Sequence, residues 1–174
     1  PATAANLGPG FDSIGMAVDL WSELTVTRGP FEVTIEGDGA DVLPTDEGNL
    51  VVAGARAAYN ARGAEFPNLK FHCVNEIPFA RGLGSSSAAI VSGIVAGFAL
   101  QGDGTDPHEA LLLAAEIEGH PDNVAPAIFG GCQIGVKAGD DWITSTIPVP
   151  EDLHAVILIP DFVGETSEAR GVLA

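Results

Sequence analysis

The chain has 174 residues, and its 24 acidic against 7 basic side chains give a formal net charge of −17. A strongly acidic surface argues against nucleic acid or an anionic membrane as the main partner, because both need a basic face. Hydrophobic residues make up 46% of the chain, enough for the core of one folded domain and too many for global disorder. The longest apolar runs, such as residues 155–160, are too short to span a bilayer.

The location of the protein is predicted from weaker signals. We expect no signal peptide, because no basic stretch followed by an apolar one opens the chain. The two cysteines, Cys73 and Cys132, form neither a CxxC motif nor a metal-ligand spacing. We therefore expect two buried free thiols and a cytoplasmic protein.

The first half of the chain is predicted to combine strands with one helix. Residues 1–10 are interpreted as a loop, and β-branched and aromatic residues over 18–28 predict a strand. A second strand is expected at 31–37, where Phe, Val and Ile alternate with polar residues. A helix then begins after Asn49 and ends before Gly63, followed by an alternating strand at 69–73.

The second half is predicted to be richer in helix. A buried helix is expected over 85–100, which is small and apolar on nearly all sides. Asp106 and Pro107 are typical of a helix start, and this helix is expected to end at Gly119. A short apolar segment occupies 124–129. Three strands are then expected, at residues 132–137, 142–147 and 154–159.

Strand and helix do not alternate regularly in this pattern, which predicts an α+β fold and argues against a doubly wound sheet. The chain opens in the expected loop and closes in a helical pattern at 166–174. We therefore expect a piece of a longer protein.

The strongest chemical signal is the segment 78–89, Pro-Phe-Ala-Arg-Gly-Leu-Gly-Ser-Ser-Ser-Ala-Ala. It predicts a strand end, a glycine loop and the start of a helix of small residues. Glycines let the backbone approach a ligand, and the first N–H groups of a helix suit a phosphate. The segment is not a Walker loop, because it has no Gly-Lys-Ser/Thr. A tight turn with capping serines and no ligand would also explain it.

The segment resembles the nucleotide-binding motif of the GHMP kinases, the family that includes galactokinase, homoserine kinase and mevalonate kinase. Residues 1–12 are similar to the opening motif of its homoserine kinases, and residues 119–131, which contain Gly-His-Pro-Asp-Asn, resemble a further motif. Residues 166–170, Thr-Ser-Glu-Ala-Arg, resemble a fourth. The four matches fall in family order and span nearly the whole chain.

The resemblance implies a domain organisation. It assigns residues 1–160 to the N-terminal, ATP-binding domain of the family, similar to domain 2 of ribosomal protein S5, without its first strand. Residues 161–174 would begin a ferredoxin-like C-terminal domain that is largely absent from the chain.

The resemblance also implies an activity: transfer of the γ-phosphoryl group of ATP to the side-chain hydroxyl of L-homoserine, a step of threonine biosynthesis. ATP and Mg²⁺ are the expected cofactors, and a homodimer is one arrangement that it allows. Two alternatives stay open. One is another small-molecule kinase of the family, acting for example on mevalonate or shikimate, and the other is a catalytically silent module of the same fold.

Nucleotide and metal residues follow from the same resemblance. Asn49 matches a position near the adenine ring, although it also fits a plain helix cap. Ser86 matches a Mg²⁺-contacting serine. Glu116 and Glu118 are both candidates for the carboxylate that binds the metal, and Glu116 is preferred because loop lengths vary more than helix patterns. The expected phosphate-loop contacts are Pro78, Phe79, Ala80, Arg81, Gly82, Leu83, Gly84, Ser85, Ser86, Ser87 and Ala88.

Six residues are implied at the acceptor site. Asp12 would pair with the ammonium of homoserine, and Arg170 would hold its carboxylate through a two-pronged contact. Asp12 is the one carboxylate nominated as a general base, but pairing with an ammonium would weaken it, so direct attack by the positioned hydroxyl is favoured. Asp12 and Asn123 are the expected catalytic residues, and the expected substrate contacts are Asn6, Asp12, His120, Thr166 and Arg170.

Overall fold

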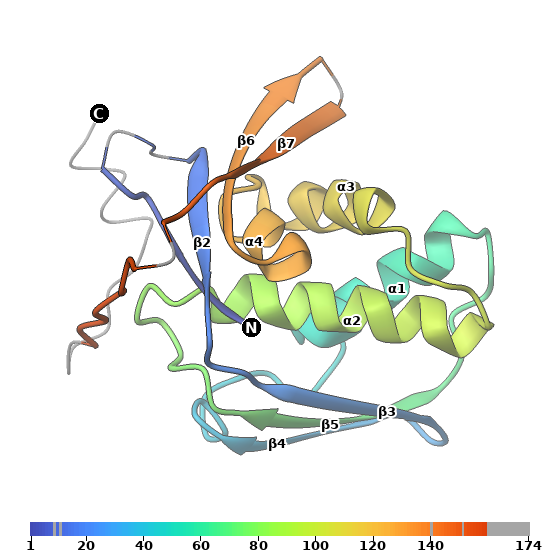
Figure 1. The fold of residues 1–174 in the computed structure, drawn as a ribbon. Coiled ribbons are helices and arrows are strands. Elements are labelled where there is room, and N and C mark those ends of the chain that lie inside the picture. Colours follow the sequence, from blue (N-terminus) through green and yellow to red (C-terminus); the bar gives the residue numbers. More distant parts are fainter. Residues whose placement is uncertain (9, 11, 140, 151, 160–174) are drawn as a thin grey trace.

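The computed structural model describes residues 1–8, 10, 12–139, 141–150 and 152–159, which form two sheets and four helices (Figure 1). The four-stranded sheet has the order β1-β2-β6-β7, with every neighbouring pair antiparallel. Its strands are β1 (Ala2–Ala5), β2 (Ile14–Val18), β6 (Cys132–Ala138) and β7 (Asp141–Ile147). The second sheet has the order β3-β5-β4, in which β5 pairs antiparallel with β3 and parallel with β4. Its strands are β3 (Glu23–Arg28), β4 (Glu32–Gly37) and β5 (Leu69–Asn75).

The helices lie in the space between these sheets. Figure 1 shows α1 (Leu50–Ala61) and α2 (Ser85–Gln101) over one face of the three-stranded sheet. On the far side of α2 lie α3 (Pro107–Glu118) and the short α4 (Val124–Phe129), next to β2 and β6. The architecture is therefore α+β, as the irregular alternation of strand and helix predicted.

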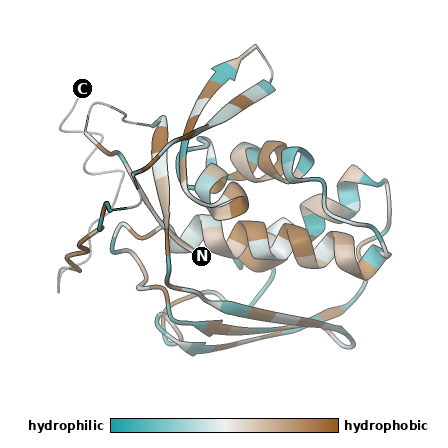
Figure 2. Ribbon diagram, viewed as in Figure 1, coloured by the Kyte–Doolittle hydropathy of each residue, from teal (hydrophilic) through white to brown (hydrophobic). Residues whose placement is uncertain are grey.

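Helix α2 packs against other elements on two sides, because it is apolar on nearly all of its faces. One core cluster fills the space between α1 and the three-stranded sheet, with Val52 and Phe71 almost completely buried. A second joins α2 to α3 and α4 through residues such as Ile94 and Phe98. Figure 2 shows the matching hydrophobic colour along α2. Helices α1 and α2 cross closely: a Cβ added to Gly54 would lie 2.3 Å from the Ile90 carbonyl oxygen.

Capping residues explain why two of the helices begin where they do. The side chain of Asn49 accepts a hydrogen bond from the Val51 N–H at the start of α1. The side chain of Asp106 accepts from the N–H groups of His108 and Glu109, with Pro107 as the first residue of α3. Both helix starts were predicted correctly from the sequence.

Four sequence expectations need comment. Residues 2–5 form strand β1 rather than a loop, since pairing with β2 overrides the weak strand preference of the Ala-Thr-Ala-Ala sequence. The strand expected over 18–28 is divided: Val18 is the last residue of β2, and β3 starts at Glu23 after a break at 19–22. No strand forms over 154–159, which lack a pairing partner among the described residues. The helical pattern expected over 166–174 lies outside the described residues.

Among the described residues, no helix combines the length and the hydropathy needed to cross a membrane.

Candidate functional site

The loop before α2 leaves the first turn of that helix open to a ligand. Gly84 precedes α2 in the left-handed conformation, with φ 63° and ψ 30°, and makes no side-chain cap. Gly82 and Ala80 in the same loop also have positive φ, 73° and 53°. Alanine adopts this conformation only at an energetic cost, so the surrounding loop must hold it there. The N–H groups at the start of α2 are thus presented by a shaped loop, an arrangement that suits an anion.

Backbone strain in the described part of the chain is confined to predicted site loops. The non-glycine residues with positive φ are Asn6, Asp12 and Ala80. A hydrogen bond joins the two ends of the loop that contains Asn6 and Asp12, because the Asp12 N–H donates to Asn6 Oδ1 at 3.0 Å. Asparagine and aspartate tolerate the left-handed region better than other residues. Backbone strain of this kind is concentrated at functional sites, so both loops are candidate ligand contacts.

The carboxylate that meets the serines of α2 belongs to Glu118. Its Oε1 accepts hydrogen bonds from Ser86 Oγ at 2.7 Å and from Ser87 Oγ at 3.0 Å. Glu118 is the last residue of α3 and is half-buried. Glu116, the residue preferred from the sequence, is exposed two positions earlier on the same helix. The geometry therefore favours the runner-up, Glu118, as the carboxylate of this site.

The segment after α3 brings a second set of polar side chains to the same place. His120 Nδ1 lies 2.5 Å from Asp122 Oδ1. The same oxygen accepts the Asn123 N–H at 2.7 Å. Asn123 Oδ1 in turn accepts a hydrogen bond of 2.7 Å from the hydroxyl of Thr3, which is completely buried on β1.

Thr3 ties these elements to the glycine loop. Its N–H donates to the Leu83 carbonyl oxygen at 3.0 Å. A Cβ built on Gly84 would lie 2.0 Å from Thr3 Oγ1 and 3.0 Å from Asn123 Oδ1. The loop before α2, strand β1 and the segment 120–123 are therefore in direct contact, although they are far apart in the sequence.

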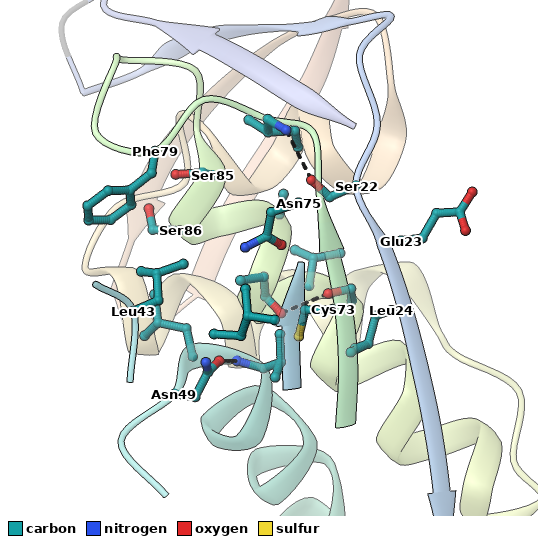
Figure 3. A pocket seen from close by; sticks show the side chains of 18 of the residues that line it. Ser22, Glu23, Leu24, Leu43, Asn49, Cys73, Asn75, Phe79, Ser85 and Ser86 are labelled. Atoms are coloured by element: carbon teal, nitrogen blue, oxygen red, sulfur yellow. Dashed lines mark hydrogen bonds between the residues drawn. The ribbon is translucent and has the colours of Figure 1, made fainter. Parts of the chain in front are cut away.

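A pocket of about 660 Å³ opens beside the start of α2 (Figure 3). Phe79, Ser85 and Ser86 lie together at one side of it, with Asn75 in the middle of the view and Leu43 below them. Most of the wall is apolar, which suits a flat ring system with a few polar contacts. Asn49 and Cys73 also line the pocket.

Two lining residues behave differently from a simple ligand contact. Asn49 is buried, and its amide serves the cap of α1: Oδ1 accepts from the Val51 N–H and Nδ2 donates to the Pro44 carbonyl oxygen at 2.6 Å. Asn49 lines the pocket, and its hydrogen bonds also hold the residues of the pocket wall in place. Cys73 is a free thiol in the wall, and burial raises its pKa. Both cysteines are buried free thiols, as expected.

Known proteins resemble the chain in sequence and in fold. Residues 49–131 match the family model described as GHMP kinases N terminal domain. A homoserine kinase of Carboxydothermus hydrogenoformans is 45% identical over 99% of the chain, and one of Moorella thermoacetica is 44% identical over 99%. The chain spans 57% and 59% of the length of these two curated relatives. The chain belongs to the GHMP kinase family.

Solved structures agree with this GHMP kinase assignment. The crystal structure of homoserine kinase from Cytophaga hutchinsonii superposes with a TM-score of 0.86 at 32% identity, over 99% of this chain and 57% of that one. A mevalonate kinase structure superposes with a TM-score of 0.64 at 16% identity, over 85% of this chain and 55% of that one, which shows the shared fold alone. The described residues therefore form a GHMP kinase N-terminal domain.

Within this GHMP kinase domain, the structure brings together the glycine loop, Ser86 and the segment containing His120 and Asn123. Asn6 and Asp12 lie on the loop that follows β1, whose Thr3 contacts that cluster. Thr166 and Arg170 lie outside the described residues.

Sequence reasoning missed Thr3 and Asp122 as parts of this polar cluster. Thr3 carries no signal, because a threonine among alanines fits a strand or a loop equally well. Asp122 stood inside a recognised motif, and only its almost complete burial sets it apart from an ordinary turn residue.

Proposed function

We propose that this GHMP kinase domain binds ATP and takes part in transferring its γ-phosphoryl group to the side-chain hydroxyl of L-homoserine. The observation that carries the proposal is the Glu118 carboxylate held on the hydroxyls of Ser86 and Ser87 at the open start of α2. The residue before α2, Gly84, makes no side-chain cap, and a carboxylate beside such a helix start fits a metal-bound polyphosphate. Homoserine, as the acceptor, is supported by the curated relatives of that name.

The nucleotide would occupy the pocket and the adjoining glycine loop. The mostly apolar pocket of about 660 Å³ would take the base, with Asn49 and Asn75 as its polar wall. The triphosphate would extend to the N–H groups of residues 85–87, where the helix dipole favours negative charge. Residues 78–88 are the proposed phosphate loop, and the positive φ at Ala80, Gly82 and Gly84 supports this role.

The donor set at the start of α2 fits Mg²⁺. This ion prefers hard oxygen ligands, keeps several waters and needs only one or two protein carboxylates beside the phosphates of a substrate. No cluster of three or more His, Cys, Asp or Glu suited to a metal occurs within the part of the chain that the structure describes, which argues against a metal held by protein alone. We propose that Ser86 and Glu118, rather than Glu116, hold the ion, which when bound neutralises phosphate charge.

The acceptor would bind beside the segment 120–123. Asn6 and Asp12 would meet the ammonium and other polar groups of homoserine, with His120 and Asn123 on the opposite wall. Thr166 and Arg170 are proposed to hold its carboxylate. The chain is acidic and has few basic residues. Among basic side chains, arginine is the one suited to a two-pronged contact with a carboxylate.

The chemistry asked of these residues is mainly orientation. The homoserine hydroxyl must lie in line with the γ-phosphorus, and the N–H groups of α2 must face the equatorial oxygens, where charge is spread in the transition state. Asp12 paired with an ammonium would be a weak base. We propose direct attack by the hydroxyl, with Asn123 orienting it through its amide.

Three wider statements belong to the same proposal. Residues 1–160 would be the ATP-binding domain, and residues 161–174 would begin a second domain that completes the acceptor site. The buried free thiols Cys73 and Cys132 support a cytoplasmic location. A homodimer is compatible with the chain.

The proposal is tested with the full-length protein, ATP and Mg²⁺, by following ³¹P signals with L-homoserine, mevalonate, shikimate and 4-hydroxybutyrate as acceptors. We expect O-phospho-L-homoserine and ADP in equal amounts, with the highest kcat/KM for L-homoserine. A higher kcat/KM for mevalonate or shikimate would assign a different family activity. ATP binding without transfer to any acceptor would identify a silent module.

A further inference from the structure

Asp122 is a buried acidic residue for which the proposed function gives no task. Its side chain is 1% exposed, and its Oδ2 has no hydrogen-bond partner among the described residues. An unpartnered carboxylate oxygen in the interior is costly, so the fold keeps it only where something offsets it. The hydrogen bonds of this carboxylate with His120 and Asn123 all involve the other oxygen, Oδ1.

A simple capping role does not explain this carboxylate. A cap accepts N–H groups from the second or third residue of the helix that it starts. In α4 the third residue is Pro126, which has no N–H, and the Ala125 N–H donates to the Pro121 carbonyl oxygen at 2.8 Å. Asp122 instead accepts the N–H of Asn123, the residue before α4, and its oxygen is directed to the imidazole of His120.

The backbone around Asp122 is held firmly, so the carboxylate has a fixed position. A Cβ built on Gly15 of β2 would lie only 1.8 Å from the Asp122 carbonyl oxygen, which means that the strand packs directly against this residue. The Asn123 side chain is fixed on its other side by the Thr3 hydroxyl. Asp122 therefore presents an immobile acceptor to a ring that is itself only 17% exposed.

A fixed acceptor decides how the imidazole is used. A carboxylate can only accept a hydrogen bond, so the ring must carry a proton on Nδ1 when it bonds to Oδ1. The ring orientation is set by the same contact.

We infer that Asp122 is a positioning residue that acts through His120, holding the ring by Nδ1 in the orientation in which it meets the acceptor substrate. The inference rests on the proposed function for the identity of that substrate, homoserine. His120 stands two residues after Glu118, which binds the serines of α2, and three before Asn123, which lies against Gly84. The ring is thus carried by the segment that joins these two parts of the site.

The kinetic test compares Asp122→Asn, His120→Ala and the double variant in the full-length protein. Asparagine keeps the size of the side chain but does not enforce the proton on Nδ1. We expect the KM for homoserine to rise on the order of tenfold in each single variant, with the KM for ATP changed by less than about twofold. Because Asp122 acts through His120, the double variant should lose no more than the His120→Ala variant.

The chain offers a matched control on its surface. His108 Nε2 lies 3.8 Å from Asp141 Oδ1, and both side chains are more than half exposed. His108→Ala, Asp141→Asn and their double variant should leave both KM values unchanged. Losses that multiply in the Asp122 and His120 cycle would overturn the inference, as would an unchanged KM for homoserine in Asp122→Asn.

A second readout needs neither activity nor the Asp122→Asn variant. A long-range ¹H–¹⁵N spectrum of wild-type protein labelled at histidine distinguishes protonated from unprotonated ring nitrogens. We expect a proton on Nδ1 of His120, assigned by its loss in His120→Ala. An unprotonated Nδ1 would overturn the inference even if Asp122→Asn failed to fold. If Nδ1 is protonated but no acceptor is phosphorylated, the positioning contact stands and the proposed function fails.

Discussion

Gly84 offers the sharpest mutational test of how the site is assembled. The residue has φ 63°, and a Cβ at this position would lie 2.0 Å from Thr3 Oγ1. A side chain in the left-handed region costs roughly 1–2 kcal/mol, and overpacking adds about 1–3 kcal/mol. We therefore expect Gly84→Ala to lower the free energy of unfolding by roughly 2–5 kcal/mol.

Gly82 provides the matched control. It also has positive φ, 73°, but a Cβ there would meet nothing within 4 Å. Gly82→Ala should therefore show only the conformational cost of about 1–2 kcal/mol. The assay is urea denaturation of both variants, alone and in a Thr3→Ala background, with ATP affinity measured by calorimetry. Removing the Thr3 hydroxyl should restore part of the loss in Gly84→Ala and none in Gly82→Ala.

Equal losses for the two glycine variants would refute the reasoning, because the contact between Gly84 and Thr3 would then have no energetic weight. Loss of ATP affinity in Gly84→Ala with full stability would also contradict it. That outcome would mean that the missing Cβ faces the nucleotide rather than β1.

Three further predictions concern other parts of the domain. In the full-length protein, Glu118→Gln should lower kcat by at least about 100-fold, the scale of one lost charge-stabilising group, while Glu116→Gln should stay near wild type; the reverse order would restore the assignment made from sequence. Cys73 lines the pocket, and burial raises its pKa above 9.0. Its alkylation, measured by mass spectrometry, should therefore speed up only at a higher pH than that of an ordinary thiol, and it should slow when ATP binds. Alkylation that ATP does not slow would place the nucleotide elsewhere. The Arg62 guanidinium lowers the pKa of Glu109 from its ordinary 4.5, so their pairing stabilises the fold above that pH and is lost as pH falls through the lowered value. Arg62→Met should therefore flatten the acid limb of the unfolding free energy below about pH 4.5, and an unchanged slope would show that the pair contributes nothing.

Local sequence chemistry was enough to predict α1, α2 and α3, whereas residues 124–129, which form α4, were identified only as an apolar segment. Asn49, and Asp106 followed by Pro107, are capping signals whose effect needs no tertiary contact, so α1 and α3 begin where expected. The small, apolar residues on nearly all sides of α2 predicted a buried helix, and the structure packs it against both α1 and the α3–α4 side. The glycine loop was recognised because positive φ leaves a direct mark on residue choice.

Features that depend on partners far away in the sequence could not be predicted. Strand β1 exists because β2 pairs with it, and residues 154–159 have the composition of a strand but no partner among the described residues. The choice between Glu116 and Glu118 is of the same kind. Two residues apart on a helix means about 200° of rotation, and only the packing of α3 on α2 decides which carboxylate meets Ser86.

The account is tested most directly by a crystal structure of the full-length protein with Mg²⁺, a non-hydrolysable ATP analogue and L-homoserine. We predict the base in the pocket beside Asn75, the phosphates on the N–H groups of residues 85–87 and the metal on Glu118. Homoserine should lie between Asp12 and the segment 120–123, with its hydroxyl facing the γ-phosphate. A nucleotide bound away from the start of α2, or homoserine bound in the pocket assigned to the base, would contradict the proposed function.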